Sequence, residues 1–95
     1  MIPSFNVSIQ SRDESLYEGS AVSLVAPGEM GYLGILASHA PIITTLKRGK
    51  ITVRTDSGKT ILIKSDDGGF MDVLKDHVSI VLESGEVVST SEVDF

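Results

Sequence analysis

The chain has 95 residues, 41% of them hydrophobic and 22% charged, a composition typical of one globular domain that excludes a disordered chain. It has no cysteine, which excludes disulfides and thiolate metal sites, and no apolar run near the roughly 20 residues that span a bilayer. The net charge of −5 argues against a nucleic-acid partner, because basic residues hold such partners.

Short strands in which apolar and polar side chains alternate account for most of the chain. The first, at residues 5–11, shows the period of two that is typical of a half-buried strand. In chain order, further strands are expected at residues 16–18, 21–26, 50–55, 60–64, 70–74 and 77–82. The runs at 50–55 and 60–64 flank a glycine-containing turn, which predicts a β-hairpin with Ile51 and Val53 on one face.

Glycine and proline punctuate these strands. We expect residues 19–20 to stop the second strand and residues 27–28 to stop the third. Gly31, Gly34 and Pro41 then follow so closely that no helix of about ten residues fits between them. The sequence therefore predicts no long helix.

Residues 34–41 form the most informative turn of the sequence. A strand ends there, turns through a polar corner at His39 and restarts after Pro41. The Pro41 ring fixes its own φ and favours extended geometry at Ala40. We therefore expect a rigid, shaped surface loop.

The C-terminal part of the chain is acidic and has few large apolar residues. Residues 85–95 are expected to form a loosely held acidic tail, with an edge strand at residues 87–88 as the alternative. The β-sandwich domain then covers residues 1–84. The predicted fold class is all-β, an antiparallel β-sandwich or flattened barrel of about 8–10 short strands.

Basic and acidic residues separate along the sequence. Six of the eight basic residues lie between positions 47 and 64, whereas acidic residues dominate from Asp66 onward. Either these stretches are solvated strand faces followed by an acidic end, or the folded domain has two oppositely charged sides that meet different partners.

The sequence shows no pattern that is typical of catalysis. His39 and His77 have no partners at metal-ligand spacing, and Asp66-Asp67 lacks the further oxygen ligands of a calcium loop. No glycine-rich loop opens a helix, and no serine, histidine and acid form a known motif. We expect no cofactor, no metal and no enzymatic activity of the isolated chain.

Several segments in order resemble one known family. They are Glu18-Gly19, residues 32–36, His39-Ala40-Pro41 with residues 42–44, residues 46–49, Gly68-Gly69-Phe70 with residues 71–73, and residues 78–82. Over about residues 4–83, the chain resembles the N-terminal β-sandwich domain of the epsilon subunit of rotary F-type ATP synthase, named delta in mitochondria. Two positions depart from the family pattern: Ala37-Ser38 replaces a usual Pro-Gly, and Tyr32 replaces an acidic or polar residue.

The resemblance implies a non-catalytic subunit of the central stalk, or rotor, which links the gamma shaft to the membrane c-ring and couples proton transport to ATP synthesis. Matching the family's gamma-binding positions gives Ser11, His39, Thr44, Asp67 and Asp72, and matching its ring-binding loop gives Glu29, Met30, Gly31 and Tyr32. It also implies a peripheral membrane protein on the cytoplasmic face of the bacterial inner membrane, or the equivalent face of an organelle.

Other interpretations remain open from the sequence. Family members usually continue into a C-terminal helical hairpin, so the chain is expected to be a piece of a longer protein or a naturally short form. Inhibition of ATP hydrolysis and ATP binding belong to that hairpin and are not carried over. The alternatives to a rotor subunit are a β-sandwich binding module of another assembly, which needs a concave aromatic site, and a small enzyme, which needs a polar pocket. Residues 1–4 lack the features of a signal peptide, so we expect the protein to stay in the compartment where it is made.

Overall fold

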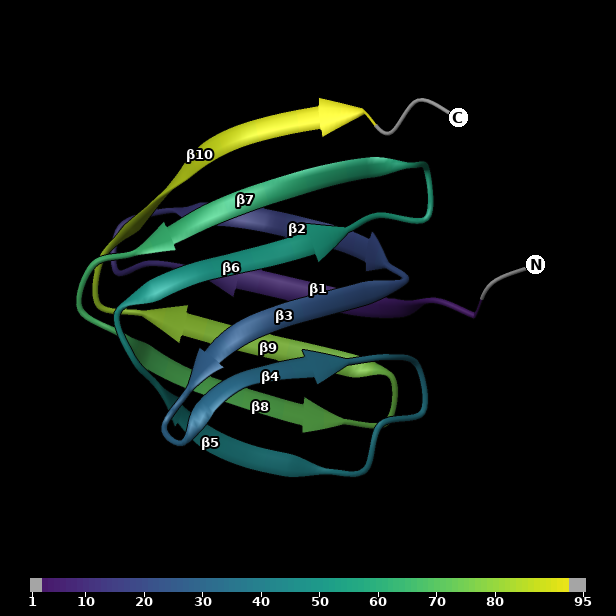
Figure 1. The fold of residues 1–95 in the computed structure, drawn as a ribbon, viewed down its shortest axis with the longest axis horizontal. Helices are drawn as coiled ribbons and strands as arrows, with labels where there is room; N and C mark the ends of the chain where they lie inside the picture. The colour runs from purple at the N-terminus through teal and green to yellow at the C-terminus, as the bar shows by residue number, and fades with distance from the viewer. Residues whose placement is uncertain (1–2, 93–95) are drawn as a thin grey trace.

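The computed structural model describes residues 3–92, which form ten strands and no helix (Figure 1). The strands are β1 (Phe5–Gln10), β2 (Ser15–Ala21), β3 (Ser23–Gly28), β4 (Gly31–Ile35), β5 (Ile42–Leu46), β6 (Gly49–Arg54), β7 (Lys59–Ser65), β8 (Gly69–Leu74), β9 (His77–Leu82) and β10 (Gly85–Glu92). The predicted all-β fold is confirmed.

The strands form two layers that are joined along one edge. One sheet has the order β4-β3-β6-β7-β10 and the other has the order β5-β8-β9-β1-β2. The single pair Gly28↔Leu46 between β3 and β5 joins them. All pairs are antiparallel except β1 with β9. The result is a flattened barrel whose two sheets enclose one core, as a β-sandwich does.

Because successive strands run in opposite directions, the loops gather at two ends of the barrel (Figure 1). We call one the hairpin end; it carries the loops at 11–14, 29–30, 47–48, 66–68 and 83–84. We call the other the corner end; it carries the loops at 36–41, 55–58 and 75–76. This division decides which predicted site residues can meet.

The core follows the period of two that the sequence shows. In β1 the side chains of Phe5, Val7 and Ile9 are buried and the residues between them are not. Ile51 and Val53 of the predicted hairpin also face the core, which confirms their shared face. The buried apolar side chains are Phe5, Val7, Ile9, Ala21, Leu24, Ala26, Ile35, Leu46, Ile51, Val53, Ile61, Ile63, Met71, Val73, Val78, Ile80 and Leu82.

The expected strand stops at glycine and proline are wrong. β2 continues through residues 19–20, and β3 continues through residues 27–28. Pro27 has no N–H to donate, but its carbonyl accepts a hydrogen bond from the Lys47 N–H at 2.7 Å. A Cβ on Gly28 would lie 2.9 Å from the Gly31 carbonyl oxygen, so glycine permits the tight β3–β4 hairpin there. Tertiary pairing overrides the local signal at both places.

The expected loose tail is also wrong over most of its length. Residues 85–92 form β10, which pairs with β7 at the edge of the first sheet, so the alternative of an edge strand is correct. The register shifts between Val87 and Ser89, and this bulge leaves Val88 out of the ladder. Residues 93–95 lie outside the described residues.

Candidate functional site

The outer face of the second sheet carries an apolar patch at its centre. In β8, Met71 and Val73 point into the core, so Phe70, Asp72 and Leu74 point outward. Phe70 is 60% exposed and Leu74 is 55% exposed, which is unusual for large apolar side chains. Outward-pointing Ile43 of β5 and Val81 of β9 are also exposed. We call the set Ile43, Phe70, Asp72, Leu74 and Val81 the Asp72 patch.

Strand register makes this patch continuous. Asp72 pairs with Ile43 on one side, and Phe70 pairs with Val81 on the other. Directly opposed side chains in a sheet have Cβ atoms about 4.5–5.5 Å apart, so these residues are neighbours across the strands. A contiguous exposed apolar surface with a polar centre is typical of a protein-docking site. Sequence reasoning found Asp72 but missed its four apolar neighbours, although the outward half of the alternating pattern would have indicated them.

The five predicted gamma-binding residues do not form one cluster. Ser11 and Asp67 lie in loops of the hairpin end, whereas His39 lies at the corner end. Thr44 alternates with the outward Ile43 and Thr45, so its half-buried side chain points toward the first sheet. Asp72 alone belongs to the exposed face between the two ends.

The corner around His39 is tied down by the β8–β9 turn. Asp76 accepts a hydrogen bond from the Ser38 N–H through its carboxylate at 2.9 Å, and from the Asn6 N–H through its carbonyl at 2.8 Å. His39 Nδ1 lies 2.6 Å from the Ala40 carbonyl oxygen, and the His39 N–H donates to the Leu36 carbonyl. The expected rigid loop therefore owes its shape to Asp76 as well as to local geometry.

Replacing Asp76 with alanine is expected to destabilise the domain by about 1 kcal/mol, because the Ser38 N–H loses its acceptor. Asp76 also has a φ of 57°, which aspartate and asparagine tolerate better than alanine. D76N keeps both an acceptor and that tolerance, so it is the matched control with no expected loss. Urea unfolding of the three proteins checks this, and equal midpoints for D76A and D76N would contradict it.

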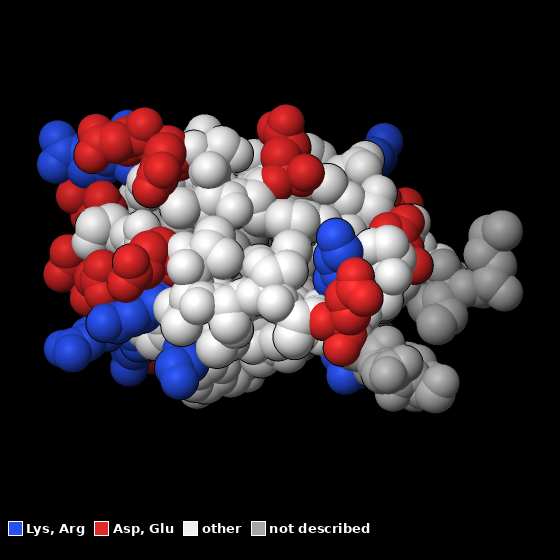
Figure 2. Space-filling model, turned by 90° about the horizontal axis from the view of Figure 1, so that it is seen from above, with Lys and Arg blue, Asp and Glu red and all other residues white. Residues whose placement is uncertain are grey.

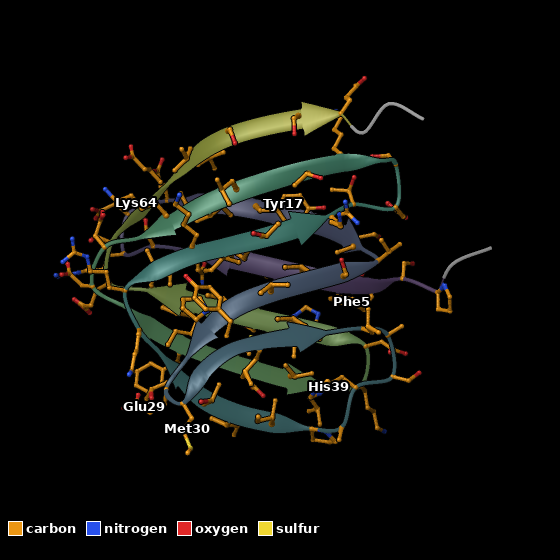
Figure 3. All side chains as sticks on the ribbon, viewed as in Figure 1. Phe5, Tyr17, Glu29, Met30, His39 and Lys64 are labelled. Carbon is orange, nitrogen blue, oxygen red and sulfur yellow. The ribbon has the colours of Figure 1, made fainter. Side chains whose placement is uncertain are left out.

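The predicted ring-binding loop is the two-residue turn of the β3–β4 hairpin. Glu29 and Met30 lie together at its tip, at the hairpin end (Figure 3), and the Met30 side chain is fully exposed. Gly31 follows with a φ of 128°, which glycine adopts without strain. The Thr45 hydroxyl donates to the Glu29 carboxylate at 2.6 Å, which braces the tip against β5.

Tyr32 is set back from that tip. Its hydroxyl accepts a hydrogen bond from the Lys50 N–H at 3.2 Å, on the outer face of the first sheet. A Cβ on Gly49 would meet both the Tyr32 hydroxyl and the Pro27 ring, so the phenol lies close over these residues. Of the four predicted ring-binding residues, the structure places Glu29 and Met30 at the tip, and the other two follow in β4.

Charges of both signs mix at the hairpin end. Arg12 Nη1 lies 3.9 Å from Glu83 Oε1, and Lys64 Nζ lies 3.5 Å from Asp66 Oδ1. Both pairs are exposed and therefore contribute little to stability. Figure 2 shows charged side chains gathered toward the ends of the barrel and a largely uncharged band between them. The basic and acidic stretches of the sequence therefore do not form two separate sides of the domain at the hairpin end, because the loops bring residues of both signs together there.

Metal-binding groups and concave surfaces were the other candidate features of the described residues. Residues 3–92 hold no group of three or more histidine and acidic side chains that could bind a metal. An open apolar cleft of about 230 Å³ is lined by Pro3, Val22, Leu36 and Ala37. Burial, and secondarily the charge of Asp56, raises the pKa of Tyr17, whose hydroxyl donates to the Ser20 carbonyl. No helix within this part of the chain is long and apolar enough to cross a membrane.

Comparison with known proteins points to one family. The family model for the ATP synthase delta/epsilon chain beta-sandwich domain matches residues 4–88. The ATP synthase epsilon chain of Leptospira borgpetersenii is 37% identical over 89 residues, which cover 94% of this chain and 68% of that one. The epsilon chain of Dichelobacter nodosus is 38% identical over 91 residues, which cover 95% and 61%. The epsilon chain of Laribacter hongkongensis is covered over 56% of its length, so this chain spans only about three-fifths of most such relatives.

Solved structures confirm the fold. A chain of the Euglena gracilis mitochondrial ATP synthase, in a structure of OSCP, F1 and the c-ring, superposes with a TM-score of 0.81 at 23% identity. The match covers 92% of this chain and 56% of that chain. A chain from the central stalk and c-ring of the Tetrahymena thermophila mitochondrial ATP synthase superposes with a TM-score of 0.65 at 15% identity, covering 92% and 65%.

Proposed function

The chain belongs to the family of ATP synthase delta/epsilon chain beta-sandwich domains, and from this premise we propose that it is a non-catalytic rotor subunit. In this role it binds the gamma shaft and the membrane c-ring, and couples proton transport to ATP synthesis. The observation that carries the proposal is the Asp72 patch, an exposed apolar surface on a rigid sheet. Such a surface suits lasting attachment to another protein rather than capture of a small substrate.

We propose that gamma lies lengthwise along the second sheet. Asp67 is at one end of this sheet, Asp72 at its centre and His39 near the other end, within a molecule 34 Å long. An elongated partner such as a coiled-coil shaft can reach all three when it lies along the strands. This arrangement accounts for Ser11, His39, Asp67 and Asp72 on one gamma-binding side without a single cluster. Thr44 points inward, so in this proposal it supports that side only through the packing of β5.

The ring contact in this proposal is the β3–β4 turn. Glu29 and Met30 project from the hairpin end, Gly31 begins β4 next to them, and the Tyr32 hydroxyl accepts a hydrogen bond from the Lys50 N–H on the outer face of the first sheet. The subunit then lies at the membrane surface without entering it, on the cytoplasmic face of the bacterial inner membrane or the equivalent face of an organelle. The role requires no cofactor.

Torque transmission requires that the domain deform little between its two contacts. Both proposed contacts are carried by strands of one close-packed core, and β3, which leads into the Met30 turn, is joined to β5 of the patch sheet. The Thr45 bond to Glu29 adds a second link between the same strands. Force on the turn is therefore passed directly to the sheet that holds the Asp72 patch.

Titration of the purified chain with purified gamma subunit tests the proposal. We expect a one-to-one complex and no ATP turnover by the chain alone. Failure to bind gamma would instead favour a β-sandwich binding module of another assembly, and ATP turnover by the pure chain would overturn the non-catalytic assignment.

Replacing Met30 with aspartate is expected to lower proton-driven ATP synthesis in reconstituted vesicles several-fold while leaving gamma binding unchanged. Met30 is the most exposed side chain of the turn, and truncating an interface anchor often costs about 1–3 kcal/mol. V88D, an exposed apolar position at the β10 bulge, is the matched control with no expected loss. Equal synthesis by M30D and V88D would show that this turn is not the ring contact.

A further inference from the structure

We propose that the surface that docks on the Asp72 patch carries a basic side chain, lysine or arginine, which pairs with the Asp72 carboxylate between the apolar side chains of the patch. The inference rests on the proposed function, in which this surface belongs to gamma. It goes further by naming the chemistry that gamma must present and the residue that selects for it.

Asp72 is a lone carboxylate in an apolar setting. Phe70 and Leu74 flank it along β8, and Ile43 faces it from β5. On its fourth side it pairs with Ser79 of β9, a small residue that leaves the carboxylate open to approach. Any partner wide enough to cover the apolar residues must also cover Asp72.

Residues 3–92 supply no ion-pair or side-chain hydrogen-bond partner for this charge. Within residues 3–92, the ion pairs join Arg12 to Glu83 and Lys64 to Asp66. No side-chain hydrogen bond in the same part of the chain involves Asp72. In the free protein, water solvates the carboxylate, because the Asp72 side chain is exposed.

Docking removes that water. Burying a carboxylate without a compensating partner is strongly unfavourable, whereas an opposite charge with good geometry recovers much of the loss. Charge-assisted bonds are also stronger than those from neutral donors, which makes a basic side chain the fitting complement. Arginine fits best, because its planar guanidinium can grip Asp72 with two bonds while it stacks on the exposed ring of Phe70.

Within the Asp72 patch, different residues supply contact area and selectivity. The four apolar residues supply contact area, which almost any apolar surface could match. Asp72 supplies selectivity, because a partner that presents an acidic or purely apolar surface leaves it buried and unpaired. An apolar patch with one central charge can therefore hold gamma firmly and still reject other apolar surfaces.

Calorimetric titration of the full chain with gamma tests the inference, using D72N and D72K. Glu18 of β2 is the matched control site, because it is exposed on the same sheet face, opposite Ser8 and outside the patch. We expect D72N to weaken binding at least about 30-fold, D72K to weaken it further, and E18Q and E18K to change it less than about threefold. Reversing the matching basic residue of gamma to glutamate should restore binding to D72K.

The outcomes separate this inference from the function it rests on. If the wild-type chain binds gamma and D72N binds equally well or more tightly, the paired cation is wrong although the function stands. If D72N binds weakly but no single reversal of an exposed basic residue of gamma rescues D72K, the pairing is also wrong. If the wild-type chain does not bind gamma, both proposals fail. Thermal unfolding of each variant confirms that it is folded.

Discussion

Replacing Gly69 with alanine is expected to destabilise the domain by about 3 kcal/mol, a large part of the roughly 5–14 kcal/mol that is typical of a domain of this size. A Cβ at position 69 would lie 2.0 Å from the Val81 carbonyl oxygen and 2.9 Å from the Leu82 Cα. Both atoms belong to the backbone of β9, so β8 and β9 would have to separate to accept the methyl group. Urea unfolding followed by circular dichroism measures the loss.

Gly34 provides the matched control for this prediction. It also lies in a strand, but a Cβ there meets nothing within 4 Å, and its backbone has no positive φ. We expect G34A to change the free energy of unfolding by less than about 0.5 kcal/mol. A similar loss in G34A and G69A would show that strand propensity, rather than the approach of β9, decides the effect.

Replacing both Ile43 and Phe70 with serine is expected to weaken gamma binding at least about 100-fold, with little loss of folding stability. These are the two most exposed apolar members of the Asp72 patch, at 78% and 60%, so they contribute little to the core. In a docked complex both become buried, and fully burying one such side chain is worth about 1.5–3 kcal/mol. Calorimetric titration with gamma measures the change.

A second double variant shows whether the effect is specific to the patch. Val87 and Val88 are exposed apolar residues of β10, at the edge of the other sheet. We expect V87S/V88S to bind gamma as the wild-type chain does. If both double variants lose binding equally, the Asp72 patch is not the gamma-binding surface.

The sequence predicted a strand correctly where neighbouring residues alone favour it. The hairpin of β6 and β7 was correctly expected, because two β-branched runs flank a turn that contains Gly58. The stops expected at residues 19–20 and 27–28 were wrong, because a neighbouring strand can hold a glycine or proline in extended geometry. The loose tail expected from residue 85 onward was wrong over residues 85–92, because β10 is ordered by its pairing with β7.

The candidate site shows the same division. Resemblance to a family singled out Asp72 and Met30, but it could not show that Asp72 sits among exposed apolar side chains or that Tyr32 turns back toward Lys50. The first depends on the register between β5, β8 and β9. The second depends on the pairing of β3 with both β4 and β6. The predicted roles in binding gamma and the ring stay predictions for all nine residues, Asp72 and Met30 included.

By itself, the sequence determined which side faces inward in the strands where apolar and polar residues alternate. Side chains alternate with a period of two, so the buried positions of β1 and of β6 follow directly from their apolar residues. Residues 3–92 contain no long helix, as the close spacing of Gly31, Gly34 and Pro41 predicted for that part of the chain. The tertiary structure alone decided which outward faces adjoin, because strand order and register come from contacts between residues far apart in the chain. Ile43 and Asp72 therefore meet as neighbours, whereas His39 and Asp67 lie at opposite ends of the barrel.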